Sequence, residues 1–496
     1  MMKTLLLSAL ATLATLTLQS AAAQEIGPDA ARHLLNRTGF AASQAEIDSF
    51  ARLTREQAAD RLLRQATTVA QTPPPRWVDE AILPFYKLRE LSQEERMREQ
   101  RLNVERGFEL REWWFREMLN TPSPLTEKMT LFWHNHFATS QQKVRYGQLM
   151  YRQNVLLRKH ALGNFGELLK DIARDPAMVV YLDSAQNRRG QPNENFAREV
   201  MELFTVGEGQ YTERDIKEVA RAFTGWSLDR ETGEFMFRPM LHDSGSKVVL
   251  GRTGAFDGDA VLDILLQQPQ TAEFITRKLW KEFISPEPDD EEAHRLARLF
   301  RNSRYDMKVL MRAMLTSDAF YAPSHRAVLI KSPVELVVGT LKQFDIETRT
   351  LRPFVLASAL LGQNVMSPPN VKGWPGGDAW INSATLLGRK QLIDRLFRAD
   401  DRMELMVARF DDKAEDLQAR AGKEARMQRM MQRGLIGEAG GIKFDLERWA
   451  AQFKGPERDG AMVRTVLAMP PYRAPKAGEP VDVIKQLVAD ATYQLK

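Results

Sequence analysis

The chain has 496 residues, 43% of them hydrophobic, and 70 Lys and Arg against 65 Asp and Glu give it a net charge of +5. A chain of this length and apolar content can bury a large core, which excludes general disorder. Basic residues are interspersed with acidic ones, so nucleic-acid binding is not expected. The absence of cysteine excludes disulfides, thiolate metal sites and haem attachment through C-x-x-C-H. No phosphate-binding loop or dinucleotide fingerprint is present, so no nucleotide cofactor is predicted.

Residues 1–23 have the pattern of a secretory signal peptide. Lys3 precedes an apolar run from Leu5 to Leu18, and three alanines end at Ala23. The run is too short and too weakly apolar for a convincing membrane span. We therefore expect cleavage after Ala23, an exported periplasmic or extracellular protein, and no transmembrane segment in the mature chain.

Helical periodicity dominates the rest of the chain. The sequence predicts helices within these ranges: Asp29 to Thr38, Ser43 to Ala66, 77–120, 125–138, 139–182, 193–226 and 257–345. The only expected strands are Gly233 to Phe237 and Lys247 to Gly251, as the two arms of one hairpin. The predicted fold is therefore mostly α, a large multi-helical domain with one short β-hairpin.

Two parts of the mature chain differ in their content of charged residues. Residues 24–395 are predicted to form the helical core domain. Residues 396–496 form a more charged helical region, with a Pro-rich linker near 470–480.

The stretch from Asn193 to Trp226 carries the densest set of polar side chains of the types that take part in catalysis or metal binding. It reads as two helices joined by a glycine turn, and Thr212 with Asp215 forms a capping box for the second helix. On the first helix three side chains share one ridge and an arginine flanks it: Asn195, Glu199 and Glu202, with Arg198. Such carboxylates are either an ordinary solvated ladder, or a pair that binds a metal or divides the acid and base roles.

The segment from Leu125 to Ala138 holds an H-x-H pair. Its apolar residues share a helical face with His136, whereas His134 points elsewhere, because positions two apart on a helix differ by roughly 200°. An H-x-H pair is thus a poor chelate on a straight helix. We expect that one histidine acts chemically while the other packs in the core.

A loop rich in Pro, Gly and Trp spans residues 362–389. Trp374 and Trp380 follow the polar residues Asn370 and Lys372 in this loop. Flat apolar rings beside hydrogen-bonding groups are typical of surfaces that stack and orient sugars. The alternative is that the tryptophans plug a helical core.

Five segments together resemble the bacterial exported family called domain of unknown function 1800. They are LTEKMTLFWHNHFATS, GQPNENFAREVMELFTVGEGQYTERDIKEVARAFTGW, HDSGSKVVLG, LIKSPVELVVG and SPPNVKGWPGGDAWINSATLLGR. The resemblance runs from about Ala31 to Arg389, and the closing ADATYQLK is similar to the end of family members. It implies a large, mostly helical exported protein without an established activity. It also suggests a partner, an exported protein of phosphatase- or sulfatase-like fold encoded nearby.

The polar residues of these segments predict one shared site. The predicted catalytic residues are Glu199, Glu202, Arg198, His134, His242 and Asp243, and the predicted substrate-binding residues are Asn195, Asn370, Lys372, Trp374 and Trp380. For a divalent metal, the candidate ligands are His134, His136 and Glu199.

Two functions remain open at this point. The first is a hydrolase or lyase that acts on an envelope or environmental polymer through a His/Glu site, with or without a metal. The second is a non-enzymatic exported binding or assembly protein, in which the polar motifs are networks that fix helix packing. An enzyme needs a cleft that solvent can reach, whereas a packing network does not.

Overall fold

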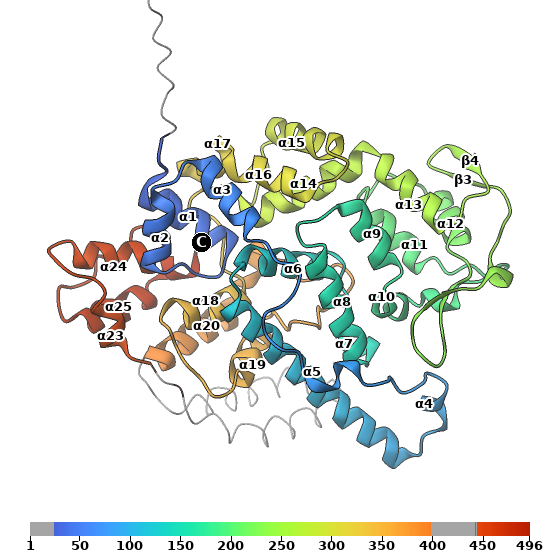
Figure 1. Cartoon of the computed structure of the whole chain (residues 1–496), viewed down its shortest axis with the longest axis horizontal. Helices are drawn as coiled ribbons and strands as arrows, with labels where there is room; N and C mark the ends of the chain where they lie inside the picture. The colour runs from blue at the N-terminus through green and yellow to red at the C-terminus, as the bar shows by residue number, and fades with distance from the viewer. Residues whose placement is uncertain (1–23, 398–441, 443) are drawn as a thin grey trace, which may run out of the picture.

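The computed structural model describes residues 24–397, 442 and 444–496 (Figure 1). The predicted signal peptide, residues 1–23, lies outside this range, as does most of the first half of the predicted charged region. The described chain is mostly α-helical, and its strands form two small two-stranded antiparallel sheets. The predicted fold class is confirmed.

The chain begins with three short helices, α1 (Gly27–Thr38), α2 (Gln44–Ala51) and α3 (Arg55–Arg64). The single helix predicted from Ser43 to Ala66 is therefore wrong. The reason is a second capping box, in which the Thr54 hydroxyl accepts from the backbone N–H of Gln57 while the Gln57 side chain accepts from that of Thr54. This box starts a new helix within the predicted one.

The next elements lead to the central helix, α6. They are η1 (Arg76–Asp79), α4 (Lys87–Glu90), α5 (Gln93–Asn120), α6 (Pro124–His136), α7 (Gln141–Val144), α8 (Gly147–Lys159), α9 (Phe165–Ala173), α10 (Pro176–Tyr181) and η2 (Ser184–Gln186). The predicted helical stretch 77–120 divides in the same way as the first, because Ser92 forms a capping box with Glu95 at the start of α5.

The Asn193 to Trp226 stretch folds as predicted into α11 (Asn195–Glu202) and α12 (Glu213–Ala222), with the Thr212 and Asp215 capping box in place. Gly207 lies between the helices with a φ of 88°, a left-handed conformation that favours glycine.

The strand pairing differs from the prediction. Strand β1 (Trp226–Leu228) pairs with β2 (Phe235–Phe237), and β3 (Lys247–Val249) pairs with β4 (Arg252–Gly254). The two expected arms are strands, but they belong to different sheets. Each has a closer partner across a short turn, and the β3–β4 turn is made by Leu250 and Gly251, both at positive φ.

Helices return after the sheets and continue to the end of the described chain. They are η3 (Pro239–Leu241) between the sheets, then α13 (Gly258–Gln267), α14 (Pro269–Phe283), α15 (Asp290–Asn302), α16 (Met307–Thr316), α17 (Asp318–Tyr321), η4 (Pro323–His325), α18 (Pro333–Gln343), α19 (Arg352–Leu360), η5 (Gly377–Trp380), α20 (Ser383–Phe397), α23 (Leu446–Ala450), α24 (Arg458–Val466), α25 (Pro480–Ala489) and η7 (Ala491–Gln494). Among these described helices, none combines the length and the apolar composition that a membrane crossing requires.

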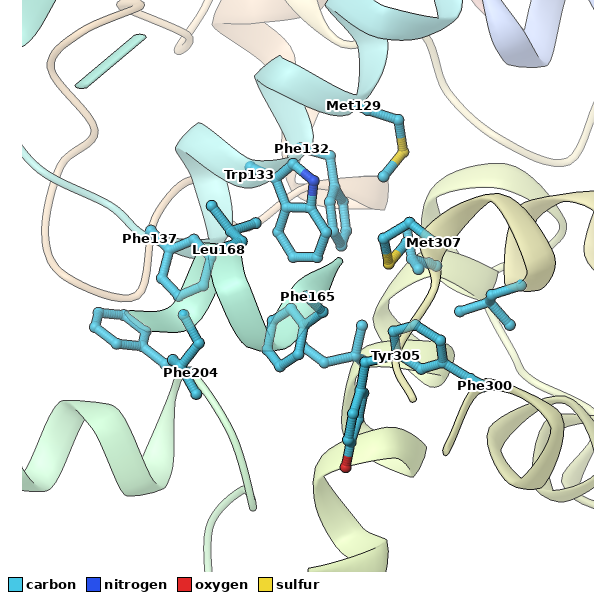
Figure 2. Close-up of a cluster of buried hydrophobic side chains, with 14 of the residues drawn as sticks. Met129, Phe132, Trp133, Phe137, Phe165, Leu168, Phe204, Phe300, Tyr305 and Met307 are labelled. Atoms are coloured by element: carbon cyan, nitrogen blue, oxygen red, sulfur yellow. The ribbon is translucent and has the colours of Figure 1, made fainter. Parts of the chain in front are cut away.

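Two hydrophobic clusters form the core, and α6 contributes to both. Met129, Phe132 and Trp133 of α6 belong to the first cluster, where they meet aromatic residues of α9 and α15 (Figure 2). Leu131 belongs to the second cluster. Because apolar neighbours surround α6, nearly every residue of this helix is buried.

The closing residues complete the second cluster. Trp449, Ile484 and Tyr493 are buried in it, and Ile330 forms a β-bridge with Leu495 just before α18. The described residues from 444 onward therefore pack against the helical core.

Candidate functional site

His134 is almost fully buried, at 1% exposure. Its Nε2 accepts a hydrogen bond from the backbone N–H of Met366 (3.1 Å), and the rings of Trp114 and Trp374 flank it. Burial lowers the pKa of His134 to about 3, so the ring is neutral. Its predicted role as a solvent-facing acid or ligand is not supported by this position.

The hydrogen bond to His134 is donated by a residue with a strained backbone. Met366 has a φ of 62°, unusual for a side chain of this kind, and its carbonyl accepts from the backbone N–H of Gln141 (2.8 Å). Both backbone polar groups of Met366 are thus satisfied. His134 therefore anchors the start of the Pro-, Gly- and Trp-rich loop.

His136 uses both ring nitrogens in the core. Its Nε2 donates to the carbonyl of Phe204 (3.2 Å), just past the end of α11, and its Nδ1 accepts from the ammonium of Lys278 on α14 (2.9 Å). Burial and the nearby charge of Lys278 hold the pKa of His136 well below its usual value. Burial in turn lowers the pKa of Lys278 to about 8. His136 thus joins three helices.

Asn135, between the two histidines, was not predicted as a functional residue. Its Oδ1 accepts from the backbone N–H of Trp374 (2.6 Å), and its Nδ2 donates to the carbonyl of Trp374 (3.4 Å). Gly373 has a φ of 79°, and a Cβ there would lie 2.2 Å from Asn135 Oδ1. The only sequence signal was its place between two histidines in the H-N-H motif.

The two tryptophans of the loop are buried in the hydrophobic core. Trp374 and Trp380 are buried at 4% and 7% exposure and belong to the second hydrophobic cluster. Their rings are therefore not a surface for stacking sugars, which corrects that interpretation. Asn370 and Lys372 remain exposed, and Asn370 Oδ1 accepts from the backbone N–H of Lys372 (2.9 Å).

The ridge on α11 reaches solvent. Asn195 is exposed, whereas Glu199 and Glu202 are half-buried. The Tyr211 hydroxyl donates to Glu202 (2.5 Å). No described residue donates a hydrogen bond to the Glu199 carboxylate.

Glu199 has the most perturbed carboxyl of this ridge. Burial raises its pKa, and the negative charge of Glu202 adds to the rise. The positive charges of Lys372 and Arg198 oppose it. Glu199 and Glu202 thus share one ridge of α11, and the charge of Lys372 in the loop acts on Glu199.

Arg198 pairs with a carboxylate that lies outside the predicted site. Its guanidinium donates two hydrogen bonds of 2.9 Å to Glu213 at the start of α12, and Glu194 lies 3.6 Å away. The hydrogen bonds to Glu213 raise the pKa of Arg198. Arg198 therefore ties α11 to α12.

His242 and Asp243 belong to the connection between the two sheets. The Nδ1 of His242 donates to the carbonyl of Thr224 (2.9 Å). Asp243 accepts from Arg221 (2.8 and 3.2 Å), which lowers the pKa of its carboxyl to about 2. The backbone carbonyl of Asp243 accepts from the buried ammonium of Lys247 (2.5 Å). These contacts fix the connection to α12.

Two buried ion pairs on α6 were not predicted as functional. Glu127 and Arg158, both 1% exposed, form a bidentate pair (2.6 and 2.9 Å), and Trp114 donates to the same carboxylate (2.8 Å). Lys128 pairs with Glu335 at the start of α18. The sequence signal for both pairs was weak, because their partners are 31 and 207 residues away.

The three predicted histidines, with the carboxylates, do not assemble into one centre. Within residues 24–397 and 444–496, no group of three or more His, Asp or Glu side chains is arranged to hold a metal ion. The set of His134, His136 and Glu199 thus gains no support as a ligand set. Two hollows described in the same residues are lined by other side chains.

Comparison with known proteins gives one match. The model of a family described as Protein of unknown function (DUF1800) matches residues 33–473. The match extends well past Arg389, where the recognisable motifs end. No curated protein and no solved structure matches the chain.

Proposed function

Because the chain belongs to the Protein of unknown function (DUF1800) family, whose description gives no activity, we propose a function from the geometry of the site and the signal-peptide pattern of the sequence: an exported, non-enzymatic binding or assembly protein. In this proposal the polar motifs build a rigid helical scaffold. The exposed part of the predicted site, on α11 and the loop of residues 362–380, contacts the partner.

The hydrogen bonds of the histidines carry the proposal. His134 and His242 bond backbone groups, and His136 bonds a backbone carbonyl and Lys278. The imidazoles of His134 and His136 are buried and bonded to the scaffold, so they are not positioned to exchange protons with a substrate. The H-x-H motif is explained by packing.

The proposed contact surface consists of polar groups that the scaffold leaves available. Lys372, Asn370 and Asn195 are exposed, and Glu199 is half-buried without a described hydrogen-bond donor. A surface that carries both signs of charge suits a partner with complementary charges. We propose the exported protein of phosphatase- or sulfatase-like fold as that partner.

The binding test mixes the purified mature protein with that partner and measures the complex by size-exclusion chromatography with light scattering. The charge reversals Glu199→Lys and Lys372→Glu should each weaken the complex and leave the melting temperature unchanged. Lys308→Glu, at an exposed position on α16, is the matched control and should bind normally. Normal binding by both site variants would refute the surface, and the absence of any complex would refute the partner.

Export has its own test. Mass spectrometry of the protein recovered outside the cytoplasm should find a chain that begins at Gln24. Recovery mainly in a membrane fraction with Met1 retained would contradict the proposal.

A second candidate function rests on the raised pKa of Glu199 beside Glu202. A carboxyl with a raised pKa next to a second carboxylate is the arrangement that divides acid and base roles in hydrolases and lyases. In that case Glu199 donates the proton, Glu202 accepts one, and Lys372 holds an anionic group of an envelope or environmental polymer. Release of fragments from isolated envelope polysaccharide, abolished by Glu199→Gln at unchanged melting temperature, would replace binding with catalysis.

A further inference from the structure

The chain between β2 and β3 carries three large apolar side chains that the fold leaves in solvent. They are Phe237 at the end of β2 and Met240 and Leu241 of η3, and the side chain of Met240, at 83% exposure, projects into solvent. The segment between α12 and α13, to which all three belong, forms the right-hand edge of the molecule in Figure 1. Exposed apolar side chains that are grouped in this way mark interaction sites.

Hydrogen bonds fix the backbone that presents these side chains. The carbonyl of Leu241 accepts from the backbone N–H of Arg189 (2.7 Å), which ties η3 to the loop of residues 187–192. That loop is itself attached to α12, because the Nδ2 of Asn187 donates to the carbonyl of Ala220 (2.8 Å). The exposed apolar residues therefore belong to a bonded part of the fold and do not hang on a free loop.

Positive charge lies next to the apolar side chains. Arg188 and Arg189 are exposed, and neither forms an ion pair with a described residue. The guanidinium of Arg188 donates to the amide oxygen of Gln191 (2.7 and 3.2 Å). Arg238, directly after β2, adds a half-buried third cation, which donates to the carbonyl of Leu228 (3.2 Å). The surface made of these arginines and the three apolar residues is called the basic apolar surface below.

The carboxylates that flank this surface along the chain are each paired with another cation. The pairs are Asp183 with Lys143, Glu194 with Arg198 and Asp243 with Arg221. The carboxylates of the β1–β2 turn lie at the opposite end of that hairpin from Phe237, which pairs with Trp226. The positive charge of Arg188 and Arg189 is therefore not neutralised by the described residues, so a complementary partner is negatively charged.

We propose that the basic apolar surface docks on an anionic lipid membrane. Phe237, Met240 and Leu241 enter the boundary between headgroups and acyl chains, and Arg188 and Arg189 bind the phosphate groups of the lipids. Apolar side chains beside basic ones are the combination that holds a peripheral protein on an anionic membrane. The proposal goes beyond the function proposed above and uses none of the residues of that contact surface.

The exposure of Met240 favours a lipid surface over a protein partner. A protein needs a pocket of matching shape to bury a side chain that projects so far, whereas the headgroup region of a bilayer admits it without one. Each arginine near an anionic membrane contributes roughly a fivefold increase in affinity, and salt screens this attraction. The attachment should therefore be reversible and should weaken as the salt concentration rises.

The test measures sedimentation of the purified mature protein with lipid vesicles. One set of vesicles consists of phosphatidylcholine, and the other contains phosphatidylglycerol in addition. At low salt the protein should bind the phosphatidylglycerol vesicles about tenfold more tightly or better, and added salt should reduce the difference. Equal binding to the two sets, or no binding to either, would overturn the proposal.

Two variants assign vesicle binding to the basic apolar surface. Met240→Asp and Arg189→Glu should each weaken binding to the phosphatidylglycerol vesicles by about tenfold, at unchanged melting temperature, because both side chains are exposed. The matched controls are Tyr472→Asp, at a side chain with 79% exposure, and Arg298→Glu, at an exposed position on α15. Both controls should bind as the wild type does. Unchanged binding by the two site variants would place the contact elsewhere and overturn the proposal.

A fluorescent label tests whether the apolar side chains enter the lipid. The chain contains no cysteine, so Met240→Cys can be labelled at that position alone with a dye that brightens in an apolar environment. Phosphatidylglycerol vesicles should increase the emission of this dye and leave that of the same dye on Tyr472→Cys unchanged. An unchanged signal from the labelled Met240→Cys variant would show that η3 stays in water, which would overturn the proposal.

Two further measurements test other occupants of the basic apolar surface. Light scattering without vesicles should give the same molecular mass for the wild type and for Met240→Asp. A dimer that this substitution dissociates would assign the surface to a second copy of the chain and overturn the proposal. Binding to polyglutamate that Met240→Asp abolishes, without binding to vesicles, would assign the surface to an acidic protein instead.

Discussion

Helices α6 and α11 both carry polar residues at helical spacing, yet these residues have different surroundings. On α6, Glu127 is 1% exposed and has two buried partners, Arg158 and Trp114. On α11, Arg198 forms an equally bidentate pair with Glu213, but on the surface. The comparison teaches that a helix covered on all sides needs a buried partner for each of its charged side chains, whereas a helix with one exposed side does not.

The energetic difference follows from solvation. A carboxylate buried between two hydrophobic clusters loses its water, so it needs its partners in order to remain ionised. A surface pair keeps most of its water and gains little from the contact. Four changes test this contrast between α6 and α11.

Glu127→Ala should have the largest effect. The change leaves Arg158 buried without its carboxylate and Trp114 without an acceptor, which should cost about 3–5 kcal/mol of unfolding free energy. Denaturant unfolding measures this loss. The matched control is Glu213→Ala, which breaks the bidentate pair of Arg198 and should leave the midpoint nearly unchanged. Similar losses in the two variants would contradict the contrast.

Gly373→Ala should have the second largest effect, through the loop that α6 anchors. The φ of 79° costs a side chain about 1–2 kcal/mol, and the new Cβ would collide with Asn135 Oδ1. Gly209→Ala is the control for strain alone, because its φ is 80° and no atom lies within 4 Å of its Cβ position. Calorimetry should find Gly373→Ala the less stable variant. Equal melting temperatures would mean that the loop moves away from α6 freely.

His134→Gln should change the pH dependence of stability. The pKa of His134 is about 3 in the folded chain and roughly 6.5 in an unfolded one. Between these values only the unfolded chain binds the proton, so the wild type loses stability as pH falls. From pH 7 to pH 5 the variant should lose about 2 kcal/mol less than the wild type. An identical loss in both would show that the ring is not buried in a neutral state.

Glu199→Gln should have the smallest effect. Unlike Glu127→Ala and Gly373→Ala, it should not lower the stability of the folded chain. Because burial raises the pKa of Glu199, ionisation of this carboxyl at neutral pH opposes folding. The amide should therefore leave the melting temperature unchanged or raise it slightly. A clear decrease would mean that the α11 ridge supports the fold, as α6 does.

Much of the fold followed from local patterns. The Thr212 and Asp215 capping box and the apolar stripes of α11 and α12 predict the observed helices, because these signals act within a few residues. Local signals of the same kind explain the wrong predictions of helix boundaries and of strand pairing. Thr54 and Ser92 start helices that the apolar stripe alone does not divide, and the turn at Leu250 and Gly251 outweighs a more distant strand.

The candidate site was less predictable, since burial depends on neighbours that are distant in sequence. Spacing gave His136 a buried face and His134 another face, but a second cluster covers that face too. In the same way, Ser332 and Glu335 form a local capping box at the start of α18. Only the folded chain brings Lys496, 161 residues away, to the same carboxylate.

The contact between α1 and α24 has a consequence for the order of events during synthesis. Arg32 donates to the carbonyl of Arg464 (2.7 Å), across 432 positions of sequence, and Gln44 accepts from Thr465 (2.5 Å). Contacts of such separation form late, because most of the chain must be made and ordered before the two segments meet. Helix α1 therefore remains without this partner until nearly all of the described helices have been made.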